Sequence, residues 1–172
     1  MKYIKKLIYC IVIILLIASV AFYFYPRDIS LQYDGIMYRL GDAKDSQTIK
    51  ISINGYISKG LFKGDTFDGT ISIGDWQLPK IHMRFDKFDR GNVFYFDESL
   101  GEYRAYGDMI SRDIRKELTI TVLEKDKEND GGSSWSSGNG LMISAPASNR
   151  KDALEISNRL MKDILGSGYE LK

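Results

Sequence analysis

The sequence predicts an α+β protein, in which an N-terminal transmembrane helix precedes a mostly antiparallel β-sheet domain with one C-terminal amphipathic helix packed on it. Three observations predict this fold class. An uncharged apolar run covers residues 7–25, apolar and polar side chains alternate through residues 48–73, and apolar side chains recur at three- and four-residue spacing through residues 153–165. These patterns are typical of a membrane span, of strands and of a helix with one buried face.

The apolar run at residues 7–25 is long enough to cross a bilayer. At about 1.5 Å per helical residue, it spans roughly the 30 Å of the hydrocarbon core. Three lysines and no acidic residue precede it, namely Lys2, Lys5 and Lys6. The positive-inside rule therefore predicts a cytoplasmic N-terminus. We expect residues 1–26 to form a cytoplasmic stub and an anchor in the cell membrane, and residues 27–172 to form an extracytoplasmic domain.

A cleaved signal peptide is the alternative to an anchor, because Ser19 and Ala21 are small residues at the spacing that signal peptidase accepts. Cleavage there would leave the four aromatic residues 22–25 at the mature N-terminus. In an anchor, the same four rings lie where the helix leaves the bilayer, a position that aromatic residues favour. Pro26 then ends the helix. We therefore favour the anchor.

Charge and cysteine content limit the functions of the outer domain. Once the three N-terminal lysines are set aside, residues 27–172 hold 21 basic and 23 acidic residues. Because a nucleic-acid binder carries a concentrated basic face, we expect no nucleic-acid partner. Cys10 is the single cysteine and lies in the apolar run. An exported domain without cysteine must be stabilised by its core, since it can form no disulfide.

Two hairpins are predicted in the first half of the domain. Residues 29–33 and 36–40 flank Asp34-Gly35, a dipeptide that favours a tight turn. Residues 48–73 form a second, longer hairpin about the Gly60–Gly64 segment, because one apolar parity continues on both sides of it. A turn centred there predicts these pairs: Ile57 with Phe67, Gly55 with Gly69, Ile53 with Ile71 and Ile51 with Ile73. The facing glycines predict a notch that a bulky side chain fills, or else a bulge or sheet bend.

Further strands are expected at residues 80–85, 93–97, 103–106, 118–123 and 141–144, with a short helix at 108–116. The apolar stripe of the C-terminal helix begins at Ala153 and ends at Leu165. Ser148 or Asn149 can cap its start, and Gly166 can end it.

Candidate catalytic residues are few. His82 is the single histidine, and its strand position places it on the polar face beside Lys80 and Arg84, which is typical of a solvated residue. The sequence contains no nucleophile, metalloprotease or phosphate-loop motif, so we expect no cofactor. Five acidic residues in neighbouring loops leave carboxylate chemistry open, since a glycosidase needs two such groups. They are Asp86, Asp89, Asp97, Glu98 and Glu102.

The segment 125–140 is rich in serine and glycine and predicts a flexible loop. Asp126, Glu128, Asp130 and Gly131 match the first part of a calcium loop, but Ser137 stands where such a loop needs a bidentate glutamate. We therefore predict no metal site. Trp135 is the candidate binding residue, because a large indole in such a loop either contacts a partner or folds back on the sheet.

Two functions remain open from the sequence. The first is a non-enzymatic binding or interaction module of the cell envelope, whose partner is an envelope component or a membrane protein. The second is a membrane-anchored hydrolase that acts on envelope polymers through a carboxylate pair. The absence of a catalytic motif favours the first.

Overall fold

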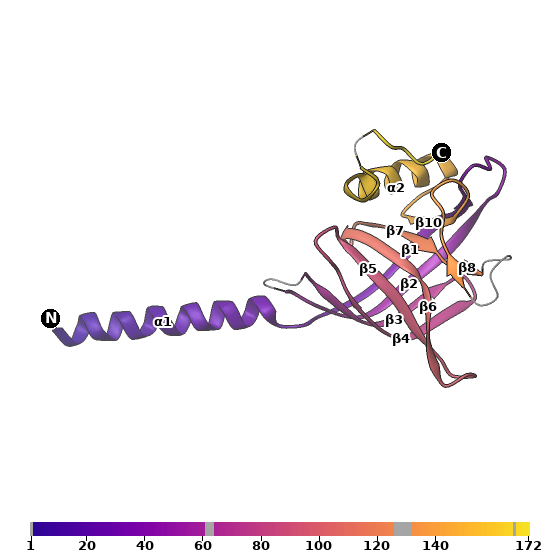
Figure 1. Cartoon of the computed structure of the whole chain (residues 1–172). Coiled ribbons are helices and arrows are strands. Elements are labelled where there is room, and N and C mark those ends of the chain that lie inside the picture. The colour runs from indigo at the N-terminus through magenta and orange to yellow at the C-terminus, as the bar shows by residue number, and fades with distance from the viewer. Residues whose placement is uncertain (1, 61–63, 126–131, 167) are drawn as a thin grey trace.

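The computed structural model describes residues 2–60, 64–125, 132–166 and 168–172. A long N-terminal helix projects from a nearly barrel-shaped antiparallel sheet, and a second helix covers part of the outer surface of the sheet (Figure 1). The three elements predicted from the sequence are therefore present.

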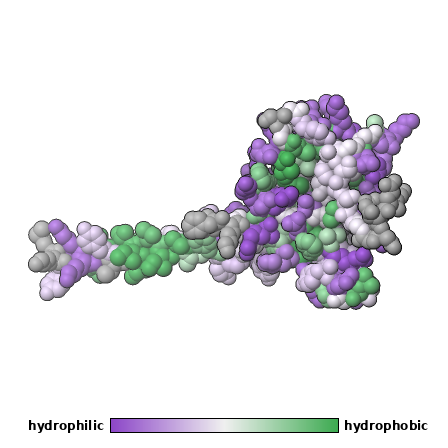
Figure 2. Space-filling view, in the orientation of Figure 1, coloured by the Kyte–Doolittle hydropathy of each residue, from purple (hydrophilic) through white to green (hydrophobic). Residues whose placement is uncertain are grey.

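Helix α1 (Lys2–Phe24) contains nearly all of the predicted span. Its 23 residues extend about 34 Å, which exceeds the thickness of the hydrocarbon core. Its apolar side chains are exposed and form the apolar surface that Figure 2 shows along the helix. The helix is thus long and apolar enough to cross a membrane. Pro26 follows its end, as predicted.

Eight strands of the described chain form one sheet in the order β4-β3-β2-β1-β10-β7-β6-β5, with every neighbouring pair antiparallel. They are β1 (Arg27–Arg39), β2 (Ser46–Ser58), β3 (Thr66–Ile73), β4 (Trp76–Arg84), β5 (Arg90–Asp97), β6 (Glu102–Asp113), β7 (Glu117–Val122) and β10 (Leu141–Ala145). Two short strands, β8 (Glu124–Lys125) and β9 (Ser133–Ser134), pair separately.

The two edge strands of the sheet, β4 and β5, lie side by side and nearly close the barrel. At one end the Asp86 N–H donates to the Arg90 carbonyl over 2.8 Å. Farther along, the Lys80 ammonium lies 4.5 Å from the centre of the Phe96 ring. Pro79 interrupts the backbone donors of β4, which is acceptable at a sheet edge.

The inside of the barrel is filled by one hydrophobic cluster, to which strands from both halves of the sheet contribute. The long hairpin supplies one parity of its residues to this cluster: Ile51, Ile53, Ile57, Phe67, Ile71 and Ile73. The register predicted for this hairpin is confirmed at all four pairs. The ring of Phe67 covers the notch at the facing glycines, where a Cβ on Gly69 would lie 2.9 Å from Cζ of that ring.

Helix α2 (Arg150–Leu165) packs on the outer face of the sheet through a second cluster. The Asn149 side chain accepts a hydrogen bond from the Asp152 N–H, and Gly166 ends the helix, as predicted. The apolar members contributed by the sheet include Ile36, Tyr38 and Met142. Beneath the helix, Ser157 contacts three further buried hydroxyls, those of Tyr38, Thr119 and Ser144.

The predicted hairpin at Asp34-Gly35 is wrong, because β1 runs without interruption from Arg27 to Arg39. The glycine serves a close approach of backbones rather than a turn. A Cβ on Gly35 would lie 2.8 Å from the Ser144 carbonyl oxygen of β10 and 3.2 Å from Cδ1 of Ile51. The same Asp-Gly dipeptide is compatible with a tight turn and with a strand in which two backbones approach closely, and here it lies in a strand.

The predicted short helix at residues 108–116 is also wrong. Strand β6 extends to Asp113 and pairs with β5 on one side and with β7 on the other. Met109 and Ile110 point to opposite faces, one into the barrel and one toward α2, and both are buried. Burial on both faces hides the alternation that identifies a strand.

Candidate functional site

Three connections meet at the end of the barrel where α1 enters, which we call the anchor end. They are the connection between β2 and β3, described at residues 59–60 and 64–65, residues 85–89 between β4 and β5, and residues 114–116 between β6 and β7. Antiparallel pairing requires this, because Arg27 at the start of β1 lies opposite Ile57 near the end of β2. The connections at residues 40–45, 74–75 and 98–101 lie at the other end.

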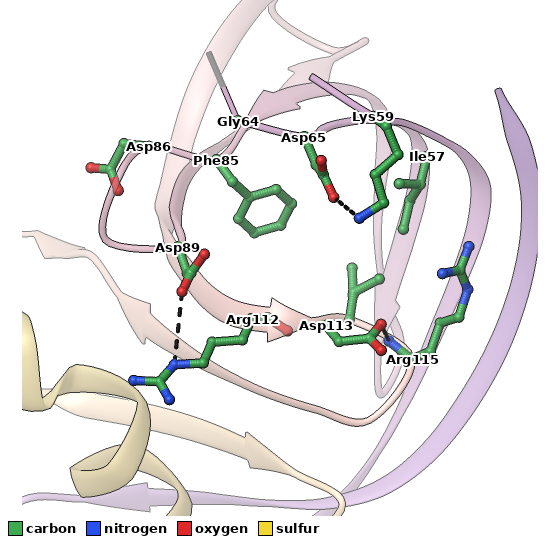
Figure 3. A pocket seen from close by; sticks show the side chains of 12 residues that line it. Ile57, Lys59, Gly64, Asp65, Phe85, Asp86, Asp89, Arg112, Asp113 and Arg115 are labelled. Carbon is green, nitrogen blue, oxygen red and sulfur yellow. Dashed lines mark hydrogen bonds and ion pairs between the residues drawn. The ribbon is translucent and has the colours of Figure 1, made fainter. Parts of the chain in front are cut away.

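A cavity of about 170 Å³ opens between these three connections (Figure 3). Its lining includes the apolar side chains of Ile57, Phe85 and Ile114, all of which are buried. The charged part of the lining consists of four carboxylates and three cationic groups: Asp65, Asp86, Asp89, Asp113, Lys59, Arg112 and Arg115. The cavity is therefore polar, and it lies over the apolar filling of the barrel.

Asp65 joins the two described ends of the first connection. Its carboxylate lies 2.5 Å from the Lys59 ammonium and accepts a 3.3 Å hydrogen bond from the Gly60 N–H. The Asp65 carbonyl accepts from the Phe85 N–H over 2.9 Å, so the same residue joins the first connection to the second. Both charges of this pair lie at the cavity.

Asp86 shapes the second connection. Its carboxylate accepts hydrogen bonds from the Phe88 N–H at 2.7 Å and from the Arg90 N–H at 3.1 Å. Burial opposes ionisation of this carboxyl group, but these two donors and the Arg90 guanidinium outweigh it. The pKa of Asp86 therefore lies below its ordinary value, and the group is a stable carboxylate.

Asp89 differs from Asp86 although they belong to one turn. Burial raises the pKa of Asp89 above its ordinary value, against the opposing charge of Arg112. The Arg112 guanidinium lies 3.8 Å from Asp89 and 3.7 Å from Asp163 on α2, so it links the cavity to the helix. Two neighbouring carboxyl groups thus have pKa values displaced in opposite directions.

The arrangement suits binding of a small charged group. At about 170 Å³ the cavity is smaller than the roughly 300–1,000 Å³ of ordinary ligand pockets, so it can admit only a terminal group of a larger molecule. Carboxylates and cations both line it, and a ligand carrying both signs of charge could exchange partners with them.

The five loop acids predicted as candidates are divided between the two ends of the barrel. Asp86 and Asp89 line the cavity. Asp97 and Glu102 face each other across the β5–β6 hairpin at the far end, with Glu98 in the turn between them. The backbone N–H and the hydroxyl of Ser99 both donate hydrogen bonds to the Asp97 carboxylate. The far-end acids therefore cannot act with the cavity.

His82 is exposed on the outer face, as its parity predicts, and its Nδ1 atom contacts the Asp68 carboxylate. A hollow of about 450 Å³ lies beside this pair, bounded by Tyr25, Pro26, Asp28, Tyr56, Ser58 and Asp68. A single carboxylate contact of this kind orients an exposed imidazole on the surface of a strand. It does not assemble a catalytic triad around the imidazole.

Trp135 is partly buried and packs against the second cluster, which lies between α2 and the sheet. Its indole Nε1 atom is buried, has no hydrogen-bond partner among the described residues, and lies against Gly140, where a Cβ would come within 2.4 Å of it. Arg39 holds the neighbouring strand β8 through both carboxylate oxygens of Glu124, at 2.8 and 2.9 Å. Contact of Trp135 with a partner stays a prediction.

The candidate calcium residues, Asp126, Glu128, Asp130 and Gly131, lie outside the described residues. Within the part of the chain that is described, no three histidine, cysteine or acidic side chains are grouped to hold a metal ion.

Sequence analysis did not single out Lys59, Asp65, Arg112 or Asp113. Each adjoins a turn, and turn residues carry charge for many reasons. Their common location follows from the antiparallel order of the strands, which brings alternate connections to one end. Arg112 and Asp113 also lie in the segment 108–116, for which a helix is predicted and a strand is found.

Comparison with known proteins adds no assignment: no family model matches the chain, and no curated protein or solved structure is a match for it.

Proposed function

We propose that this chain is a membrane-anchored, extracytoplasmic binding module of the cell envelope, held in the bilayer by residues 7–25. Its ligand is an envelope component that presents a small terminal group with both signs of charge. The observation that carries this proposal is the anchor-end cavity, in which four carboxylates and three cationic groups surround about 170 Å³. Fixed charges of both signs favour recognition of a complementary charged group.

Binding is tested by thermal unfolding of the full chain in detergent with three soluble probes. Glycerophosphoethanolamine carries both charges, glycerol phosphate carries the anion alone, and ethanolamine carries the cation alone. A ligand at 100 times its Kd stabilises the folded state by about 2.7 kcal/mol and so raises Tm. We expect the zwitterion to raise Tm most, because it alone carries a partner for both the carboxylates and the cations of the cavity.

Two variants of β6 sharpen this test. Arg112→Gln removes a cavity cation and should lose the Tm increase. Arg104→Gln is the matched control, because Arg104 lies on the same strand at the far end, 3.8 Å from Asp97. An equal Tm increase in wild type and Arg112→Gln, or none with any probe, would contradict the proposal.

A hydrolase is the second candidate, and one observation favours it. Asp86 and Asp89 line the same cavity, and their surroundings displace their pKa values downward and upward, so the two carboxyl groups differ in proton affinity. Release of soluble sugars from envelope polysaccharide by the wild-type chain, but not by Asp89→Asn, would support this candidate over simple binding.

The orientation of the chain gives a separate prediction. Because three lysines precede the apolar run, we expect protease added to intact cells to digest or release residues 27–172 and to spare the N-terminus. An epitope tag at each end reports the result on an immunoblot. Protection of the C-terminal tag in intact cells, with digestion after lysis, would reverse the orientation.

A further inference from the structure

We infer that the anchor end of the barrel rests on the lipid head groups, with Phe88 in the membrane interface and Lys87, Arg115 and Lys116 against lipid phosphates. This inference rests on the proposed anchoring by α1. It adds a docking surface, which we call the head-group face, formed by these four side chains of the second and third connections.

The chain between helix and barrel is too short to hold the domain away from the bilayer. Helix α1 ends at Phe24 and strand β1 begins at Arg27, so two residues join them. Two extended residues reach at most about 7 Å. Pro26 further restricts this link, and the Arg27 guanidinium lies 5.8 Å from the centre of the Phe22 ring. The start of β1 must therefore lie close to the level where the helix leaves the membrane, and the three connections belong to this same end of the barrel.

Charges at the anchor end are segregated by exposure. The four acidic side chains of the cavity are partly buried, and each has a cationic partner: Asp65 with Lys59, Asp86 with Arg90, Asp89 with Arg112, and Asp113 with Lys116. The exposed tips of the second and third connections carry cations instead, and the Lys116 side chain is 79% exposed. Asp28, next to Arg27, is an exposed acid close to the helix exit. The second and third connections thus present positive charge outward, as an anionic lipid surface requires.

Phe88 gives this surface an apolar contact. It lies at the tip of the second connection, 38% exposed, and its ring is covered on one side by the Lys87 ammonium at 4.8 Å from the ring centre. An exposed aromatic ring flanked by a lysine is suited to the bilayer interface, where the ring enters the head-group layer and the ammonium remains at the phosphates.

The test measures the depth of this tip in the full chain. Cys10→Ser removes the native thiol, Phe88→Cys receives a nitroxide label, and the protein is placed in vesicles of phosphatidylcholine and phosphatidylglycerol. Leu100→Cys is the matched control, because Leu100 is an exposed apolar residue in the turn of the β5–β6 hairpin at the far end. Electron paramagnetic resonance compares access of a water-soluble nickel chelate with access of oxygen, which partitions into lipid.

We expect the label at position 88 to be protected from the nickel chelate and the label at position 100 to be accessible. The protection should weaken in vesicles of phosphatidylcholine alone and should be lost when Lys87, Arg115 and Lys116 are all replaced by glutamate. Equal access at positions 88 and 100, in vesicles that retain the chain after alkaline carbonate washing, would overturn this inference alone. Release of the chain by that wash would overturn the anchoring and, with it, the docking surface.

Discussion

Replacing Ile53 with aspartate is expected to prevent folding of the barrel. Ile53 is fully buried in the inner cluster, where it pairs with Leu31 on β1 and with Ile71 on β3. The change removes an apolar side chain, at a cost of about 2–5 kcal/mol, and buries a carboxyl group without a partner, which costs several kcal/mol more. Total stability is about 5–15 kcal/mol, so the sum approaches or exceeds it. Urea unfolding of the full chain in mild detergent, followed by tryptophan fluorescence, measures the loss.

Ser52→Asp is the matched control for Ile53→Asp. Ser52 is the preceding residue of the same strand and points to the outer face, opposite Gln32 and Ser72. A carboxylate there stays hydrated, and the expected change lies within about 0.5 kcal/mol. If the two variants lost stability equally, the inner and outer faces of β2 would not be distinct, and the barrel interior would be wrongly assigned.

The long hairpin could be predicted to the residue because its information is local. Its strands bury one face, so the alternation of Ile51, Ile53, Ile71 and Ile73 fixes both the face and the register. The helix α2 could be predicted for the same reason, since Ala153, Ile156 and Leu160 bury one stripe. A strand or helix that buries a single face shows a regular spacing of apolar residues, and this spacing can be found in the sequence.

The elements beneath α2 could not be predicted in this way. The second half of β1 and the centre of β6 lie between two clusters, so neighbouring residues such as Met109 and Ile110 are both buried and the period disappears. The cavity was missed for a related reason. Its residues come from three connections that are distant in sequence, and their meeting depends on the order of strands around the barrel.

Strands that are buried on both faces also contain buried polar groups, and the sequence pattern does not predict them. Thr119 and Ser144, on the outer face of β7 and β10, have oxygen atoms 2.9 Å apart, and the Ser157 hydroxyl of α2 lies 2.8 and 2.7 Å from them. Tyr38 joins from β1, with its hydroxyl 2.6 Å from that of Ser157. Since buried hydroxyls are costly when unpaired, this network defines one position of the helix on the sheet.

Tyr38 is therefore the residue whose loss should most weaken the contact between α2 and the barrel. It is fully buried, its ring lies 5.6 Å from the Arg150 guanidinium, and its hydroxyl contacts Ser157. Burial raises the pKa of this hydroxyl above its ordinary value, so it stays neutral and able to donate near neutral pH. Both the ring and the hydroxyl thus contribute to the packing of the helix.

Tyr38→Ala is expected to cost about 3–5 kcal/mol, as for other large buried aromatic side chains, and to lower Tm by roughly 10 °C. Tyr38→Phe keeps the ring and removes one hydrogen bond, so it should cost about 1 kcal/mol. Ser157→Ala in the Tyr38→Phe background should then cost less than in wild type, because the two hydroxyls share one interaction. Thermal unfolding of the four variants measures this coupling. Additive losses from Tyr38→Phe and Ser157→Ala would mean that the two hydroxyls act separately, and that their contact does not position α2 on the sheet.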